Sequence, residues 1–244
     1  MMQSIIQLAG VTKVYGTGQR ATTALRDLTL EIAPGEFVSL MGPSGSGKTT
    51  LLNLMAGLDK PTRGRVIVDG MDLGTLAYHE LADLRLRAIG FVFQSFNLMP
   101  ALTVEENVAW PLEFSGCGRA EVRRRTGDAL ERVGVTDREG RYPGELSGGE
   151  QQRVAIARAI ATAPRMLLAD EPTGNLDSLT GQSILDLLRA INVTDGVTVV
   201  MVTHNVLAAA YGHRTLELHD GAIVRDVRMP ASDGPETTVT IKLQ

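Results

Sequence analysis

A glycine-rich segment at residues 42–49 combines the residue types that bind phosphate groups. Its sequence, Gly42-Pro-Ser-Gly-Ser-Gly-Lys48-Thr49, fits the pattern G-x-x-x-x-G-K-[ST]. Glycines let the backbone curl so that successive N–H groups point at phosphate oxygens, and the helix that begins near Lys48 adds the positive end of its dipole. Lys48 is expected to reach the β- and γ-phosphates of ATP, and the Thr49 hydroxyl to ligate Mg²⁺. The residues predicted to bind the nucleotide here are Gly42, Pro43, Ser44, Gly45, Ser46, Gly47, Lys48, Thr49 and Thr50.

Two carboxylates and a histidine follow apolar runs further along the chain. Asp170 and Glu171 come directly after residues 166–169, and His204 follows residues 198–203. Because parallel strands bring their carboxyl ends to one edge of a sheet, all three side chains are expected beside the phosphate loop. We expect Asp170 to hold Mg²⁺ and its waters, Glu171 to orient or deprotonate the attacking water, and His204 to complete the catalytic site. The alternatives are a solvated strand end for the acidic pair and a structural role for His204.

Composition and charge limit the classes of protein that the chain can belong to. It has 244 residues, 43% of them apolar, and a formal net charge of −4, which argues against a nucleic-acid partner bound through overall charge. The single cysteine, Cys117, cannot form an internal disulfide and fits a reducing cytoplasm. No signal peptide is expected, and no apolar run approaches the roughly 20 residues of a membrane-spanning helix. We therefore expect a protein that reaches a membrane only through a partner.

The apolar pattern predicts strands that alternate with helices. The expected strands are 5–14, 24–32, 37–41, 65–68, 90–93, 166–169, 198–203, 215–218 and 222–227, and the expected helices are 49–57, 103–114, 119–133, 147–163, 179–191 and 206–211. Such alternation implies an α/β fold with a mostly parallel sheet covered on both faces. The prediction is a P-loop NTPase core with an N-terminal antiparallel β subdomain.

The stretch 95–163 reads as helix-rich with no convincing strand. We interpret it as a helical subdomain inserted into the α/β core. The predicted division is therefore one ATPase domain at 1–228, with a core at 1–94 and 164–228, followed by a polar tail at 229–244. The function of that tail stays unassigned.

The segment Leu146-Ser-Gly-Gly-Glu-Gln151 and the residues after it resemble the signature motif of ATP-binding cassette (ABC) proteins. Physically, Ser147, Gly148 and Gly149 sit at a helix start, where backbone N–H groups and a hydroxyl form an anion site. The resemblance implies that two cassettes pair head to tail, with Ser147, Gly148 and Gly149 of one chain closing on the γ-phosphate held by the other. A capped amphipathic helix is the plainer interpretation of the same stretch, and one helix can serve both purposes.

Three further positions match the family pattern in the expected order over roughly residues 5–227. Tyr15 resembles the aromatic residue that stacks on adenine, and Gln94 resembles the glutamine that contacts Mg²⁺ and senses the γ-phosphate. Asp177, in Asn175-Leu-Asp177, resembles the loop that crosses the dimer interface. Asn205 departs from the aspartate that often follows the switch histidine.

The segment 170–178, Asp-Glu-Pro-Thr-Gly-Asn-Leu-Asp-Ser, is similar to the cassettes of lipoprotein-release and macrolide-export systems. The resemblance implies a homodimer on ATP binding, integral membrane permease subunits as partners, and a place on the cytoplasmic face of the cell membrane. A cassette that drives a cell-envelope process without moving a substrate is an alternative, as is a soluble non-transport ATPase. Cargo, direction, partner identity and the choice between homodimer and heterodimer stay open.

The groove between Gln94 and the helix at 103–114 is expected to receive a short cytoplasmic helix of the membrane partner. Four apolar side chains are expected to supply contacts there: Phe96, Leu98, Met99 and Leu102. The alternative is that these four pack the helical subdomain itself. Trp110 is interpreted as a packing residue rather than a membrane anchor.

Overall fold

The computed structural model describes residues 4–228, so the predicted tail at 229–244 lies outside the described residues. The strands are β1 (Ile6–Tyr15), β2 (Thr22–Ile32), β3 (Phe37–Met41), β4 (Arg63–Val68), β5 (Met71–Asp72), β6 (Ile89–Phe93), β7 (Met166–Asp170), β8 (Thr198–Val202), β9 (Arg214–His219) and β10 (Ala222–Arg228). The helices are α1 (Lys48–Met55), α2 (Tyr78–Ala88), α3 (Val104–Glu113), α4 (Arg119–Val133), α5 (Gly148–Ile160), α6 (Ser178–Asp195) and α7 (Val206–Ala209), with short 3-10 turns η1 (Gly18–Arg20), η2 (Thr136–Arg138) and η3 (Pro143–Glu145).

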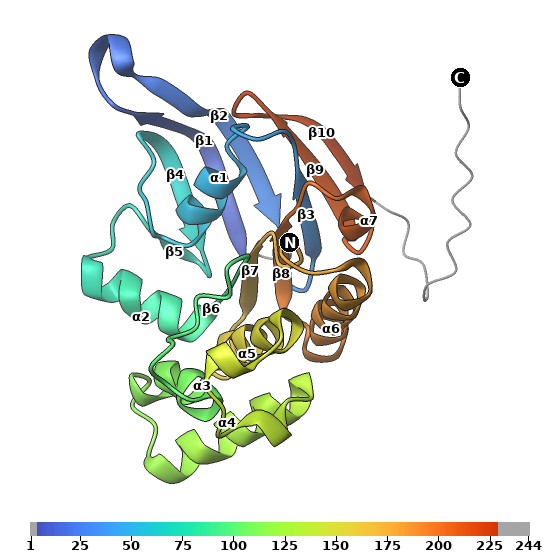
Figure 1. The fold of residues 1–244 in the computed structure, drawn as a ribbon. Helices are drawn as coiled ribbons and strands as arrows, with labels where there is room; N and C mark the ends of the chain where they lie inside the picture. Colours follow the sequence, from blue (N-terminus) through green and yellow to red (C-terminus); the bar gives the residue numbers. More distant parts are fainter. Residues whose placement is uncertain (1–3, 229–244) are drawn as a thin grey trace.

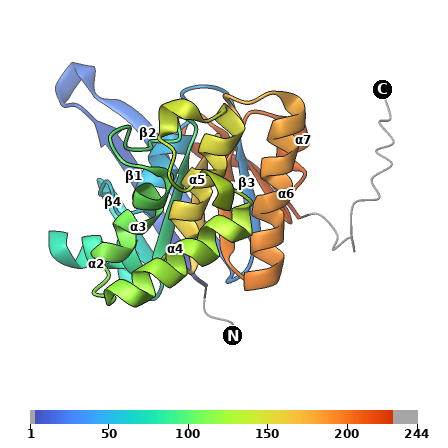
Figure 2. The same cartoon turned by 60° about the horizontal axis from the view of Figure 1, so that its bottom comes forward.

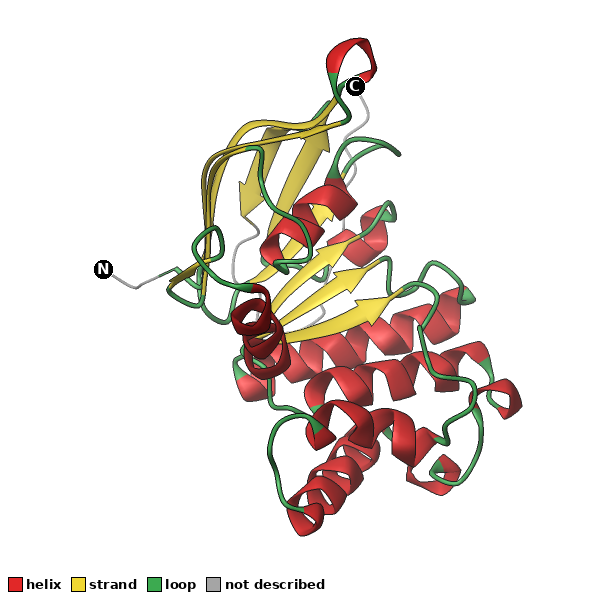
Figure 3. Ribbon diagram, turned by 90° about the vertical axis from the view of Figure 1, so that its left-hand side faces the viewer, coloured by secondary structure: helices red, strands yellow, loops and turns green. Residues whose placement is uncertain are grey.

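The strands form two sheets, as the sequence predicts (Figure 1). The core sheet has the order β10-β9-β3-β8-β7-β6, in which β9, β3, β8, β7 and β6 are parallel and only β10 is antiparallel to its neighbour. The second sheet has the order β2-β1-β4-β5 and is antiparallel throughout. Figure 3 shows helices packed together on one side of the core sheet and the antiparallel sheet on the other. The predicted α/β fold with an N-terminal antiparallel subdomain is confirmed.

Strand β8 shows why the core sheet is buried on both faces. All five of its residues are buried, and the last four alternate between two apolar clusters. Val200 and Val202 join the cluster that includes α1 and the antiparallel sheet, whereas Val199 and Met201 join the cluster under α3, α4, α5 and α6. A parallel strand covered on both faces needs a continuous run of β-branched and apolar residues, which Thr198–Val202 supplies.

Helices α3, α4 and α5 lie between β6 and β7 in the chain and pack against one another (Figure 2). The predicted capping box at the start of α3 is present: the Thr103 hydroxyl accepts a hydrogen bond from the Glu106 N–H, and the Glu106 carboxylate accepts one from the Thr103 N–H. Helix α4 has the predicted bounds and ends at Gly134 in the left-handed conformation. These helices share one apolar cluster with the core sheet, and their separation as an inserted subdomain stays a prediction.

Two elements were not predicted, helix α2 and the short strand β5. The residue before α2 is Ala77, which has no side-chain hydrogen-bond acceptor, so the usual serine, threonine or aspartate signal is missing. Instead, the Glu80 carboxylate caps the helix by accepting a hydrogen bond from the Ala77 N–H at 2.7 Å. Half of the capping box suffices to start this helix.

A buried arginine joins the antiparallel edge of the core sheet to its neighbours. The Arg214 side chain is 8% exposed and makes two hydrogen bonds of 2.7 Å to the Asp226 carboxylate across the β9–β10 pair. It also donates to the Glu31 carbonyl at 2.8 Å and lies 3.5 Å from the Glu36 carboxylate. One guanidinium therefore neutralises two carboxylates and links β9 to β10 and to the end of β2.

We predict that Arg214→Met lowers the free energy of unfolding by about 2 to 3 kcal/mol, because it removes the ion pair of Asp226 and leaves the largely buried Glu36 carboxylate with only Arg228, 3.9 Å away. The matched control is Arg65→Met, which removes an ion pair to Asp72 whose arginine is 67% exposed and should cost at most about 1 kcal/mol. Urea unfolding of both variants measures the difference. Equal losses would contradict the structural role of Arg214.

Candidate active site at the carboxyl edge of the core sheet

The phosphate loop connects β3 to α1, as predicted. Gly42 has a φ of 146°, and a Cβ atom there would lie 2.2 Å from the Leu218 carbonyl oxygen. Gly47 precedes α1 with a φ of 103°, and a Cβ atom there would lie 2.5 Å from the Ala24 carbonyl oxygen. Both positions therefore exclude any side chain, since left-handed backbone and close approach to another strand coincide. The loop is held in shape by β2 and β9 on either side.

Lys48 is the first residue of α1 and is only 8% exposed. Its Nζ atom donates hydrogen bonds of 2.8 Å to the carbonyls of Gly42 and Pro43, so the ammonium group spans the inside of the loop. The Ser46 hydroxyl is buried in the same loop and has no hydrogen-bond partner. A buried ammonium group and an unsatisfied hydroxyl in a turn of glycines are the features expected of an anion site.

Asp170, the last residue of β7, faces the start of α1. Its Oδ2 atom lies 3.4 Å from the Thr49 hydroxyl, which donates to it. Burial raises the pKa of the Asp170 carboxyl, and the neighbouring Glu171 carboxylate raises it further, whereas Thr49 and Lys48 lower it. A cation bound beside this carboxylate would favour its charged form and so lower its pKa. Thr49 and Asp170 were predicted to share a site, and the structure brings them together.

Glu171 and His204 also meet at this edge. The Glu171 Oε2 atom lies 3.1 Å from Nδ1 of His204, which follows β8. Glu171 has a φ of 47°, a left-handed conformation that is unusual for a residue with a side chain. Its N–H donates to the Val202 carbonyl at 3.0 Å, and its carbonyl accepts from the Gly174 N–H at 3.0 Å. The backbone is thus turned sharply at the end of β7, and the carboxylate is directed toward His204.

Gln94 follows β6 at the same edge and is tied to the loop after Glu171. Its side-chain amide donates to Asn175 Oδ1 at 3.3 Å, and the Asn175 amide donates back to the Gln94 carbonyl at 3.0 Å. Asp177 caps α6 by accepting hydrogen bonds from the N–H groups of Leu179 and Thr180. Hydrogen bonds from Thr180 lower the pKa of the Asp177 carboxyl. Sequence reasoning missed the role of Asn175 as the partner of Gln94.

Ser147 is the N-cap of α5 and forms a complete capping box with Glu150. The Glu150 carboxylate accepts hydrogen bonds from the Ser147 N–H and hydroxyl, both at 2.8 Å, and contacts Arg138 at 2.8 Å. The Arg138 guanidinium and then Ser147 lower the pKa of Glu150 to about 2. The S-x-x-E spacing was a signal for this cap that the sequence reasoning did not use.

The first residues of α5 lie against the loop after β7 rather than against the phosphate loop of the same chain. Gly148 approaches Leu176 and Phe96, and Gly149 approaches Thr180. Ser147 itself is exposed. The start of this helix therefore has an exposed serine, followed by two half-buried glycines beside the loop after β7 and the start of α6.

Tyr15, predicted to stack on adenine, is the last residue of β1 and is 42% exposed. Its hydroxyl donates to Asp59 at 2.8 Å, and the Lys13 ammonium lies 4.8 Å from the centre of its ring. Burial raises the pKa of the Tyr15 phenol, and the Thr50 hydroxyl of α1 is among its neighbours. The ring therefore lies beside the start of α1, where a base attached to the bound phosphates would extend.

A groove of about 490 Å³ runs between α2, β6 and α3. Of the four apolar residues expected there, only Met99 lines it, whereas Leu98 packs into the apolar cluster beneath the helices. Trp110 lines the groove, is 43% exposed and contacts Phe114 edge to face, and its interpretation as a packing residue rather than a membrane anchor stays a prediction. Leu58 and Pro111 add to the apolar lining, and Arg158 supplies a guanidinium.

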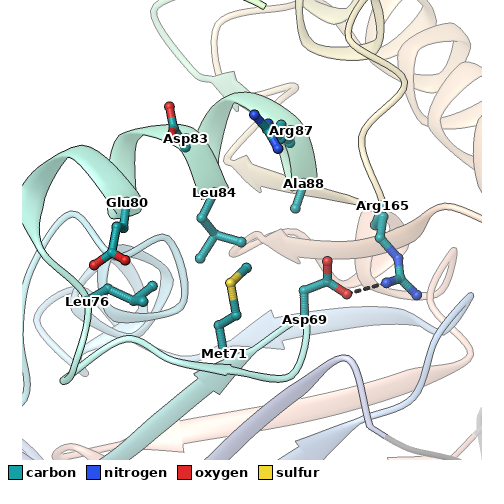
Figure 4. A pocket seen from close by; sticks show the side chains of 9 residues that line it. All are labelled: Asp69, Met71, Leu76, Glu80, Asp83, Leu84, Arg87, Ala88 and Arg165. Atoms are coloured by element: carbon teal, nitrogen blue, oxygen red, sulfur yellow. Dashed lines mark hydrogen bonds and ion pairs between the residues drawn. The ribbon is translucent and has the colours of Figure 1, made fainter.

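A second hollow, of about 400 Å³, lies beside α2, near the amino ends of β6 and β7 (Figure 4). Asp69 and Arg165 form an ion pair on one side of it, and Glu80, Asp83 and Arg87 line the other. Arg165 precedes the amino end of β7. This hollow therefore contains none of the residues predicted to bind or act on a nucleotide.

Comparison with known proteins agrees with this geometry. The family model described as ABC transporter matches residues 25–174. A protein of Methanocaldococcus jannaschii named as an uncharacterized ABC transporter ATP-binding protein, MJ0796, is 48% identical over 233 residues, which cover 94% of this chain and 99% of that protein. The macrolide export ATP-binding/permease protein MacB of Brucella melitensis is 45% identical over 235 residues, which cover 96% of this chain but 36% of that longer protein.

Solved structures show the same fold. A dimeric structure of MJ0796 in a post-hydrolysis state bound to ADP and Pi has a TM-score of 0.85 and 45% identity, and the match covers 93% of this chain and 100% of that one. A second dimeric structure of MJ0796 has a TM-score of 0.86 at 47% identity, over 93% and 100% of the two chains. None of the described helices is both long and apolar enough to span a bilayer. Family model, relatives and site geometry agree, and the chain belongs to the ABC transporter family as one of its ATPase cassettes.

Proposed function

We propose that this chain is the ATP-hydrolysing subunit of an export-type or lipoprotein-release-type membrane transporter. The convergence of the phosphate loop, Asp170 and the Glu171–His204 pair at one sheet edge is the observation that carries the proposal. Relatives named as macrolide export ATP-binding/permease proteins support the transporter class, because in them a matching cassette forms part of one longer chain. The work is done from the cytoplasmic face of a membrane, through permease partners.

The oxygen atoms at the end of β7 fit Mg²⁺. Thr49 Oγ1 and Asp170 Oδ2 face each other at 3.4 Å, and hard oxygen donors are what this ion prefers. In the part of the chain that the structure describes, no group of three or more His, Cys, Asp or Glu side chains could hold a metal ion. A magnesium ion that also binds substrate phosphates and waters needs few oxygen atoms from the protein. Thr49, Asp170 and Gln94 would hold it, and it would neutralise charge on the phosphate oxygens.

The chain's own groups have distinct tasks in hydrolysis. Lys48 exchanges its contacts with two loop carbonyls for phosphate oxygens, and the N–H groups of the loop bind the remaining oxygens. Tyr15 supports the adenine. Glu171 accepts the proton of the attacking water. His204, whose Nδ1 atom lies 3.1 Å from Oε2 of Glu171, keeps that carboxylate oriented toward the water. Ser147, Gly148 and Gly149 of a second chain complete the γ-phosphate side, because in one chain Ser147 is exposed and the two glycines lie beside Leu176 and Thr180 rather than beside the phosphate loop.

We predict that Glu171→Gln binds ATP but hydrolyses it at least about a hundredfold more slowly, since the amide cannot accept the proton of water. The variant should also accumulate as an ATP-bound dimer. Steady-state phosphate release and size-exclusion chromatography with ATP measure the two effects. The control is Glu217→Gln on the exposed face of β9, which should behave like the unchanged protein. Normal turnover by Glu171→Gln would refute the assignment.

Removal of the loop ammonium tests the phosphate site separately. Lys48→Ala should weaken ATP binding by about tenfold or more, because a charge-assisted contact to phosphate contributes roughly 1.5 to 3 kcal/mol. Titration of a fluorescent ATP analogue measures the affinity. Arg225→Ala, which removes an exposed positive charge from β10, serves as the matched control. Tight binding by Lys48→Ala would show that the ammonium group does not contact phosphate.

The groove lined by Met99, Trp110 and Leu58 is proposed to receive a short cytoplasmic helix of the permease. Trp110→Asp should lower the stimulation of ATP hydrolysis by the membrane partner at least about tenfold, because large aromatic side chains dominate such contacts. Val193→Asp, at another exposed apolar position, should leave stimulation unchanged. Co-reconstitution with the permease measures the ratio of stimulated to basal rate. Full stimulation of Trp110→Asp would exclude this groove as the docking site.

A further inference from the structure

A glutamine on the signature helix reaches the loop that carries the catalytic carboxylate. Gln152 lies in the second turn of α5 and its side chain is fully buried. Its Nε2 atom donates a hydrogen bond of 2.8 Å to the carbonyl of Pro172, the residue directly after Glu171. No other side chain of α5 is hydrogen-bonded to this loop within residues 4–228. Helix α5 and the catalytic loop are therefore joined by one amide.

The chemistry of this amide argues against a simple packing role. Its Oε1 atom is buried and has no hydrogen-bond partner. The amide cannot be turned around to relieve this, because the Pro172 carbonyl can only accept. An unsatisfied oxygen is costly in a protein interior, and a leucine or methionine would fill the same volume without one. A glutamine here is explained by the one hydrogen bond that it does make.

That hydrogen bond holds a backbone that is otherwise unfavourable. Glu171 has a φ of 47° and precedes a proline, which restricts its conformation further. Such a conformation persists only when the surroundings hold it in place. Two backbone hydrogen bonds do so, from Glu171 to Val202 and from Gly174 to Glu171, each 3.0 Å long. Gln152 adds the third, and it alone comes from the helix that begins at the signature.

We propose that Gln152 is a positioning residue for Glu171, and that through it closure of one ATP site of the dimer promotes hydrolysis in the other. The inference rests on the proposed function. In the head-to-tail dimer, α5 of each chain begins at Ser147 on the partner's ATP, and the same helix holds its own Glu171 through Gln152. The signature therefore acts on the partner's nucleotide and on its own chain's carboxylate through one rigid helix.

The first test is Gln152→Met, which keeps the volume and removes the hydrogen bond. We expect kcat to fall by about 10- to 100-fold, the cost of a misplaced catalytic group, with KM for ATP and ATP-driven dimerisation within about twofold of the unchanged protein. The Hill coefficient for ATP should fall from about 2 toward 1 as the two sites lose their coupling. Thr126→Val is the matched control: it changes a buried polar side chain on α4 whose hydroxyl is also unsatisfied, and kcat should not change. Unchanged kcat and Hill coefficient in folded Gln152→Met would overturn the proposal.

A second variant keeps the test decisive if the first folds poorly. Gln152→Glu has the same shape, and only its protonated form can donate to the Pro172 carbonyl. Its kcat relative to the unchanged protein should therefore recover as the pH is lowered, with the comparison made at each pH. A ratio that does not depend on pH would contradict a role for the donated hydrogen bond.

Failure of this inference can be told from failure of the proposed function. Adding Gln152→Met to the Glu171→Gln variant should cause no further loss, because residues that act through one group are not additive. If Glu171→Gln alone is inactive while Gln152→Met hydrolyses ATP normally, the coupling is refuted and the site assignment stands. If Glu171→Gln turns over normally, both are refuted.

Discussion

The register of three parallel strands is the constraint on which the whole site depends. Asp170 at the end of β7 is level with Val202 of β8, which is level with Leu40 of β3. Because of this register, the phosphate loop, the acidic pair and His204 leave the sheet at the same height. Strand β8, buried between two apolar clusters, is paired in this register with β7 on one side and β3 on the other.

In the proposed function, one chain holds half of a catalytic site. The groups proposed to bind phosphate and handle water lie at one edge, while Ser147 at the start of α5 is exposed. The head-to-tail pairing that the resemblance implies joins the two halves, and solved relatives form dimers. The hydrogen bonds of Gln94 with Asn175 and of Gln152 with Pro172 run between these halves within one chain.

Features that are local in the sequence could be predicted. Phe37–Met41 is a compact apolar run next to a phosphate pattern, and its bounds agree with β3. The capping box at Thr103 and the bounds of α4 depend on neighbouring residues only, and both were predicted correctly. Helix α2 was missed because Glu80 alone caps it. The juxtaposition of Asp170 with Thr49 followed from the topology of parallel strands, although these residues are far apart in the chain.

Features that depend on packing could not be predicted. The left-handed conformation of Glu171 and its contact with His204 arise from the hydrogen bond to Val202, and no residue type at 171 signals them. Met99 lines a groove, whereas Leu98 turns inward, a distinction that periodicity in a short loop cannot make. The partner of Gln152 likewise depends on how α5 lies against β7.

The central claim is that two chains complete each ATP site, and the dependence of specific ATPase activity on protein concentration tests it most directly. At saturating ATP, specific activity should rise with concentration and level off once the protein is dimeric. Activity per chain that stays constant down to extreme dilution, where the protein is monomeric by light scattering, would contradict the account.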